Sequence, residues 1–255
     1  MTEIEEMIEF SACSETKHKG RFIKIIAYLQ SLMCFEDILN VVLTLCLQKR
    51  LSFNICTSFI QDNKQGLCET IVVPLTKRIF GKLLYKNKYQ VSIKKLKHSL
   101  IMHEISHAIE KELKINLSKV FVPSVLSDLD QLKKSNIVLA KNVYDIMVKD
   151  LRLYNSAQHD SEIFARYFEL IAMTQEVSGE KSIYISDIKS LFKKTSAWVE
   201  ECLKPQLKSL TDQRVKDLSI KIKKRDVLGS KVFWGVKNQP KNIGKWSDSV
   251  KSNFE

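Results

Sequence analysis

Residues 103–107 read H-E-I-S-H, an H-E-x-x-H pattern with the side-chain types and spacing of a catalytic zinc site. On a helix, residues four positions apart share a face, so His103 and His107 could present two imidazole nitrogens to one zinc ion. Glu104 lies about 100° further round the helix and could reach a water molecule held by that metal. The metal would lower the pKa of the water, and Glu104 would accept its proton. The pattern therefore predicts hydrolytic chemistry that depends on Zn2+.

The residues around this pattern are uncharged, although the chain is rich in lysine. The side of the helix opposite the two histidines is apolar and carries Ile101, Met102, Ile105, Ala108 and Ile109. A zinc helix that is buried on most sides needs such a face. The alternative is an ordinary amphipathic helix whose histidines lie on the solvent side with Glu110 and Lys111.

A catalytic zinc ion needs three protein ligands and one open position, so a third ligand must come from elsewhere in the chain. Residues 160–170 hold the best candidate, because Glu162, Arg166 and Glu169 form a polar stripe opposite a broad apolar face. Asp160 is the expected N-cap of this helix. Glu162 would complete a His-His-Glu set and Arg166 could orient it, while Glu169 and His159 remain alternative ligands. Without the upstream pattern, Glu162 and Arg166 would be interpreted as a solvated ion pair.

Glu162 stands in the string S-E-I-F-A-R-Y-F-E, 55 residues after His107. Together with H-E-I-S-H, this string resembles the gluzincin type of zincin metallopeptidase. It is similar to the glutamate helix of the lethal-factor-like branch, with its E-x-F-A-x-x-F pattern, and to zincin-like modules of phage and mobile-element polyproteins. The resemblance covers about residues 85–175. It implies a zincin-like fold, His103, His107 and Glu162 as zinc ligands, and Glu104 as the catalytic base.

The same resemblance implies a role for Tyr154. Lethal-factor-like enzymes place a tyrosine a couple of turns before the glutamate, aimed at the oxyanion, and Tyr154 precedes Glu162 by eight residues. The thermolysin-type Glu-x-x-x-Asp is absent, because position 166 is Arg.

Length and composition indicate a globular protein. The chain has 255 residues, of which 44% are apolar, enough for one domain with a smaller appendage. The longest apolar run, at residues 38–47, is too short to span a membrane, and the acidic N-terminus is unlike a signal peptide. The six cysteines lack paired metal-ligand spacing and are expected to be reduced, buried thiols. These features predict a cytoplasmic protein, or one secreted or delivered without a cleavable signal peptide.

Positive charge is concentrated at the C-terminal end. Residues 204–255 hold thirteen basic and five acidic residues, which gives +8 of the total net charge of +12. Four aromatic residues, Phe233, Trp234, Trp246 and Phe254, are interleaved with the lysines. One interpretation is a solvated basic tail. The other is an electrostatic contact for an anionic partner, such as nucleic acid or an acidic surface.

The order of predicted elements favours an α+β, zincin-like fold, mainly helical with a small mixed sheet before the active-site helix. Helices are expected at 20–49 (two), 95–112, 124–134, 137–153, 161–176 and 186–203. Strands are expected at 51–60, 69–75 and 82–93, with a polar turn at 86–88. Residues 85–93 could be an edge strand that pairs with an extended peptide. The predicted parts are an N-terminal helical segment (1–50), a metallopeptidase domain (51–203) and a basic tail (204–255).

These observations favour a zinc-dependent endopeptidase that acts on a protein or peptide substrate. Two alternatives remain open from the sequence. One is a non-proteolytic zincin-like binding module that contacts nucleic acid or a protein partner through its basic tail. The other is a secreted effector or toxin protease that cleaves one host protein.

Overall fold

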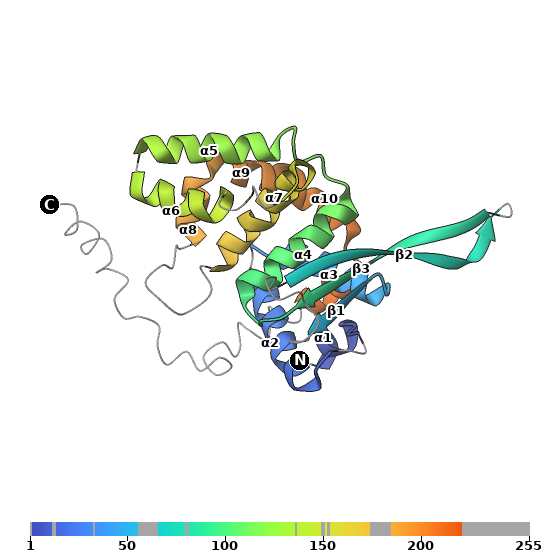
Figure 1. The fold of residues 1–255 in the computed structure, drawn as a ribbon. Helices are drawn as coiled ribbons and strands as arrows, with labels where there is room; N and C mark the ends of the chain where they lie inside the picture. Colours follow the sequence, from blue (N-terminus) through green and yellow to red (C-terminus); the bar gives the residue numbers. More distant parts are fainter. Residues whose placement is uncertain are drawn as a thin grey trace, which may run out of the picture. The chain divides into compact units, whose positions relative to one another are not determined.

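A computed structural model describes residues 2–11, 14–32, 34–55, 66–79, 82–135, 137–148, 151, 154–173 and 185–220. Within these ranges the chain is mostly helical with a small mixed three-stranded sheet, so the predicted α+β class is confirmed (Figure 1). The N-terminal half contains α1 (Thr2–Met7), α2 (Thr16–Ser31), α3 (Glu36–Leu47), β1 (Leu51–Ile55), β2 (Gly66–Ile79), β3 (Lys82–Ile93) and α4 (His98–Leu113). The C-terminal half contains α5 (Phe121–Ser135), α6 (Ile137–Val148), α7 (Ser156–Met173), α8 (Ile185–Leu191), α9 (Lys193–Trp198), the π-helical turn η2 (Val199–Leu203), α10 (Lys204–Leu210) and a last helix over 213–220.

The sheet places β3 in the centre, which corrects the predicted edge strand. The strand order is β1-β3-β2, with β1 parallel and β2 antiparallel to β3. The outer side of β1 is covered by the N-terminal segment, because the Phe53 amide donates to the Glu9 carbonyl and the Ser11 amide donates to the Phe53 carbonyl. The strand at the other edge is β2, and it lies against α4 (Figure 1). Residues 85–93 are therefore internal to the sheet.

The predicted turn at 86–88 is also wrong. β3 runs without interruption through these residues, with Lys86 paired to Val73 and Asn87 paired to Val72 of β2. The chain reverses between Ile79 and Lys82 instead. Continuous pairing with β2 satisfies the backbone of the polar residues, and this tertiary contact outweighs their preference for turns.

The helix α3 lies at the centre of the N-terminal half. It has no charged residue after Asp37, and Ile38–Cys46 are all buried, as expected for a helix that is apolar on every side. It packs against α1, α2, β1, α4 and α10. Residues 1–50, the predicted N-terminal helical segment, belong to the same compact unit as the sheet and α4.

The helices of the C-terminal half differ from the prediction in their bounds. α7 begins at Ser156, because the Asn155 side chain accepts a hydrogen bond from the Gln158 amide at 3.1 Å. Asp160, the predicted N-cap, lies inside this helix. The helix predicted at 186–203 is interrupted at Phe192, which has ψ of 58°, so α8 and α9 are separate.

Helical structure continues past Lys204, the predicted start of the basic tail. Leu207, Val215 and Leu218 are buried, and the Ser219 hydroxyl donates to the Asn40 side chain at 2.6 Å. The first compact unit accordingly runs to Ser219. Residues 220–255 keep nine basic and three acidic residues, a net charge of +6. The four tail aromatics lie outside the described residues.

Four of the six cysteines lie in the described residues, and all four are free thiols. Cys46 and Cys68 are buried as expected, whereas Cys202 is exposed. Cys13 and Cys56 lie outside the described residues. Among the described helices, none has the length and apolar character that crossing a membrane requires.

Candidate metal centre

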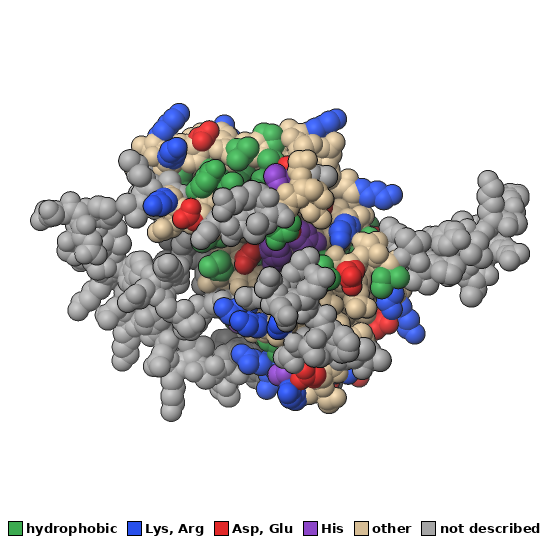
Figure 2. Space-filling model, in the orientation of Figure 1, with side chains coloured by type: hydrophobic (Ala, Val, Ile, Leu, Met, Phe, Trp, Pro, Cys, Tyr) green, Lys and Arg blue, Asp and Glu red, His purple; other side chains and the backbone are tan. Residues whose placement is uncertain are grey.

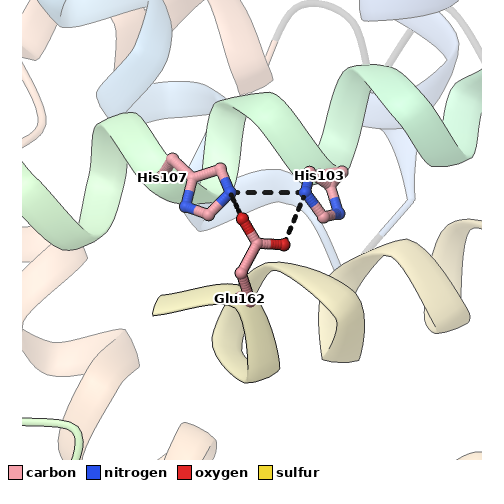
Figure 3. Close-up of side chains that lie close together, drawn as sticks. All are labelled: His103, His107 and Glu162. Atoms are coloured by element: carbon pink, nitrogen blue, oxygen red, sulfur yellow. Dashed lines mark hydrogen bonds and ion pairs between the residues drawn. The ribbon is translucent and has the colours of Figure 1, made fainter. Parts of the chain in front are cut away.

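Two helices that are distant in sequence bring three potential metal ligands together. α4 packs along α7, and His103 and His107 of α4 point toward Glu162 of α7 (Figure 3). The two Nε2 atoms lie 3.3 Å apart. One carboxylate oxygen of Glu162 lies 3.5 Å from His103 Nε2, and the other lies 3.5 Å from His107 Nε2. The predicted ligand residues therefore form one cluster.

Apolar faces on both helices direct these side chains inward. The predicted apolar face of α4 is fully buried, each of Ile101, Met102, Ile105, Ala108 and Ile109 being 0% exposed. On α7 the buried face consists of Ile163, Phe164, Tyr167, Phe168, Ile171 and Ala172. Because these faces pack into the core, the polar stripe of α7 meets the histidine stripe of α4. The cluster still reaches the surface: the side chains of His103 and His107 are 14% and 11% exposed. Figure 2 shows the largest group of histidine atoms near the middle of the face it draws.

A hydrogen bond to Glu169 fixes the orientation of His103. Its Nδ1 lies 2.8 Å from Glu169 Oε2. An ionised carboxylate only accepts hydrogen bonds, so Nδ1 carries the proton and donates. In the neutral ring, Nε2 therefore presents its lone pair toward Glu162. Glu169, an alternative ligand from the sequence, instead holds the ring of His103 from outside the cluster.

A second chain of hydrogen bonds orients His107. Ser161 donates its hydroxyl proton to Glu110, so its oxygen can accept from His107 Nδ1, which lies 2.9 Å away. This arrangement again leaves Nε2 with a lone pair directed toward Glu162. Both imidazoles are thus set in the tautomer that a metal ligand requires.

The cluster fits a zinc ion. Two imidazole lone pairs and a carboxylate converge, and Glu162 Oε2 is buried with no hydrogen-bond partner. Converging acceptors of this kind are unfavourable unless a cation lies among them. For tetrahedral zinc, metal–ligand distances of about 2.0–2.2 Å place neighbouring ligand atoms roughly 3.3–3.5 Å apart. The two Nε2 atoms, 3.3 Å apart, match this requirement, and each oxygen of Glu162 lies 3.5 Å from one of them.

The pKa shifts in the metal-free cluster also indicate a site that favours positive charge. Burial by itself would lower the pKa of His103, but the nearby carboxylates of Glu162 and Glu169 outweigh it and raise this pKa to about 10. Burial would raise the pKa of Glu162, but the adjacent imidazoles of His103 and His107 bring it down to about 2. Without a metal, a proton on His103 supplies the positive charge that the site demands.

Glu104 lies beside the cluster and is only 5% exposed. Burial raises the pKa of its carboxyl group, and Glu162 and Glu169 add to the effect, whereas the two histidines oppose it. A raised pKa is what a general base needs in order to hold a proton near neutral pH.

Tyr154 is half-buried next to the same group of charges. Burial raises the pKa of its phenol, and the carboxylate of Glu162 raises it further, while a hydrogen bond to Arg166 lowers it. Arg166 Nε also lies 3.9 Å from Glu162 Oε2, as an orienting partner would. His159, the other alternative ligand, is not in the cluster, because its Nε2 is bonded to the Tyr154 carbonyl at 3.0 Å.

Three residues at this site escaped the sequence analysis. Glu110 was assigned only to a solvent face, although it follows His107 by three positions and so shares its side of the helix. Ser161 directly precedes Glu162, and nothing in the sequence marked it. Gly66 lies against Glu104 in space, and only the packing of β2 on α4 reveals this contact.

No family model, curated protein or solved structure matches this chain.

Proposed function

We propose that this chain is a zinc-dependent peptidase with a zincin-like active site between α4 and α7. The observation that carries the proposal is the convergence of His103, His107 and Glu162, with separations of 3.3–3.5 Å and a buried carboxylate oxygen that makes no hydrogen bond. These three residues would hold the metal. When bound, zinc supplies a Lewis acid that lowers the pKa of water and polarises a carbonyl group.

Glu104 is assigned the role of general base. It follows His103 directly, interacts electrostatically with both histidines, and has a pKa that burial raises. It accepts a proton from the attacking water and returns it to the leaving amine. A buried carboxylate that is not a metal ligand is free to carry this proton in both directions.

Tyr154 is assigned to the oxyanion that develops on the substrate carbonyl. The phenol of a tyrosine is protonated at neutral pH, and burial moves the pKa of Tyr154 further from that range, so it can donate a hydrogen bond. Arg166 contacts both Tyr154 and Glu162, and it therefore holds the donor and one ligand in a fixed relation.

A peptide is the substrate class that suits the surroundings of the cluster. β2 is an edge strand, and its first residue, Gly66, lies against Glu104. Extended peptides add to such edges through main-chain hydrogen bonds, which do not depend on one side chain. A peptide bound there has its backbone close to the proposed base.

The test compares wild-type protein with Glu104→Gln and Glu162→Gln. Zinc per chain is measured by mass spectrometry of the metal, and hydrolysis is measured with a library of quenched fluorescent peptides. We expect the wild type to retain about one zinc, as three protein ligands require. Glu104→Gln should keep the zinc but lose about 10²–10⁴-fold in hydrolysis, because an amide cannot accept the proton. Glu162→Gln should lose both.

Glu201→Gln is the matched control, because Glu201 is exposed on η2 and makes no contact with the cluster. It should behave as the wild type. Full hydrolysis by Glu104→Gln, or full zinc content in Glu162→Gln, would contradict the proposal.

A further inference from the structure

Gly66, the first residue of β2, occupies a position where no side chain fits. A Cβ atom placed there would lie 2.7 Å from Cγ and 2.8 Å from Cδ of Glu104, and closer still to Oε1. Real Cβ atoms essentially never approach other atoms this closely. The strand backbone and the carboxylate are therefore in direct contact, and this contact exists because residue 66 is glycine.

The backbone conformation does not explain the glycine. Gly66 lacks the positive φ that side chains disfavour, and it pairs with Ile93 of the central strand in the ordinary antiparallel register. A glycine within a strand weakens it, because it costs entropy and packs no side chain. Among the described residues, the side chain of Glu104 takes the space that a Cβ at this position would need.

Glu104 has little freedom to move away. Its side chain is 5% exposed, and it projects from a helix whose neighbouring positions, Ile101, Ile105 and Ala108, are fully buried. The clash involves Cγ as well as the tip of the side chain, so a Cβ at residue 66 would force a new χ1 rotamer. The carboxylate would then leave the place beside His103 and His107 from which it can act.

We infer that Gly66 is a positioning residue for the general base: the missing side chain creates the space that Glu104 occupies, so β2 selects its rotamer. The inference rests on the proposed function, since it assigns Gly66 a part in the same reaction. The inference also connects the base with the proposed substrate edge. Gly66 belongs to β2, the strand proposed to pair with the peptide, and the same residue aligns this strand with Glu104.

The first experiment replaces Gly66 by alanine and uses Gly20→Ala as its matched control. Gly20 lies in α2, and no atom lies within 4 Å of the Cβ that alanine would add. We expect Gly66→Ala to retain zinc and to lower kcat by about a hundredfold, because a displacement of about 1 Å is enough for such a loss. KM should change little, since substrate binding does not involve the carboxylate. Gly20→Ala should match the wild type in all three measurements.

If Gly66 only supported the fold, the result would differ. Gly66→Ala would then have a lower zinc content and a lower Tm, but an unchanged kcat per zinc-loaded molecule. That outcome would overturn the inference.

The second experiment needs no substrate and separates this inference from the proposed function. The Tm is measured for the wild type, Gly66→Ala, Glu104→Ala and the double variant. If the two residues compete for one space, the alanine at 66 lowers Tm in the wild type but not in the Glu104→Ala background. Equal losses of Tm in both backgrounds would refute the contact. Suppose instead that Gly66→Ala lowers Tm only when Glu104 is present, and that the protein hydrolyses no peptide. The proposed function would then be refuted, and the contact between Gly66 and Glu104 would stand.

Discussion

Zinc binding to this site should release a proton from His103. In the metal-free protein, the carboxylates of Glu162 and Glu169 raise the pKa of His103 to about 10, so the imidazole is charged at neutral pH. A metal ligand must present a lone pair, and the proton on Nε2 has to leave before zinc can bind. The carboxylate of Glu162, with a pKa of about 2, is already ionised and releases nothing.

The size of the effect follows from these values. Below the pKa of His103, each pH unit should strengthen the apparent zinc affinity by at least about tenfold, or about 1.4 kcal/mol, for the one proton displaced. Between pH 7 and pH 9 the affinity should therefore rise at least about a hundredfold.

The assay is competition with a fluorescent zinc chelator across this pH range, together with calorimetry in two buffers that differ in ionisation enthalpy. Glu169→Gln removes one of the two carboxylates that hold the proton, so it should release less than the wild type at pH 8–9. His18→Asn, in a histidine outside the cluster, serves as the control. A zinc affinity that stays flat from pH 7 to pH 9, with no proton released, would refute the reasoning.

The remaining predictions concern stability, ligand orientation and the C-terminal boundary. In the metal-free protein, the stabilisation from His103 is complete below about pH 6.5 and is lost as pH rises toward about 10. The stabilisation from Glu162 is complete above about pH 4.5 and is lost as pH falls toward about 2. The Tm measured in the presence of a chelator should therefore be highest between pH 4.5 and 6.5. Ser161→Ala should weaken zinc binding by about 10–100-fold through loss of the His107 contact, whereas exposed Ser209→Ala should not. Leu207→Ala should lower the free energy of unfolding by about 2–5 kcal/mol in urea titration, because its side chain is buried in the first unit. Truncation after Ser219 should leave zinc content unchanged, and a loss of zinc would show that residues 220–255 support the site.

Much of the site could be predicted because helical periodicity is local. His103 and His107 share a face wherever a helix forms, and the apolar residues between them decide which side is buried. The same periodicity in residues 160–170 predicts the polar stripe of α7 without any knowledge of α4. The helices and the mixed sheet followed for the same reason, since periods of 3.6 and 2 residues can be read from a short window.

The strand prediction failed where local patterns are ambiguous. Polar residues 86–88 predict a turn, but pairing with β2 carries β3 through them, and this pairing depends on residues some fifteen positions away. The edge of the sheet was misplaced for a related reason. Whether β2 or β3 lies outside depends on strand order, which the alternation of side chains within a strand does not encode.

The sequence by itself determined which side chains could bind and activate a metal: two histidines and a glutamate on one helix, and a carboxylate stripe on another. The tertiary structure decided how they are used. Only the packing of α7 on α4 places Glu169 on His103 and links Glu110 through Ser161 to His107. Only the packing of β2 on α4 sets Gly66 against Glu104. These contacts join residues 38–66 positions apart, and the approach of whole elements fixes them, because it depends on how their buried faces fit together.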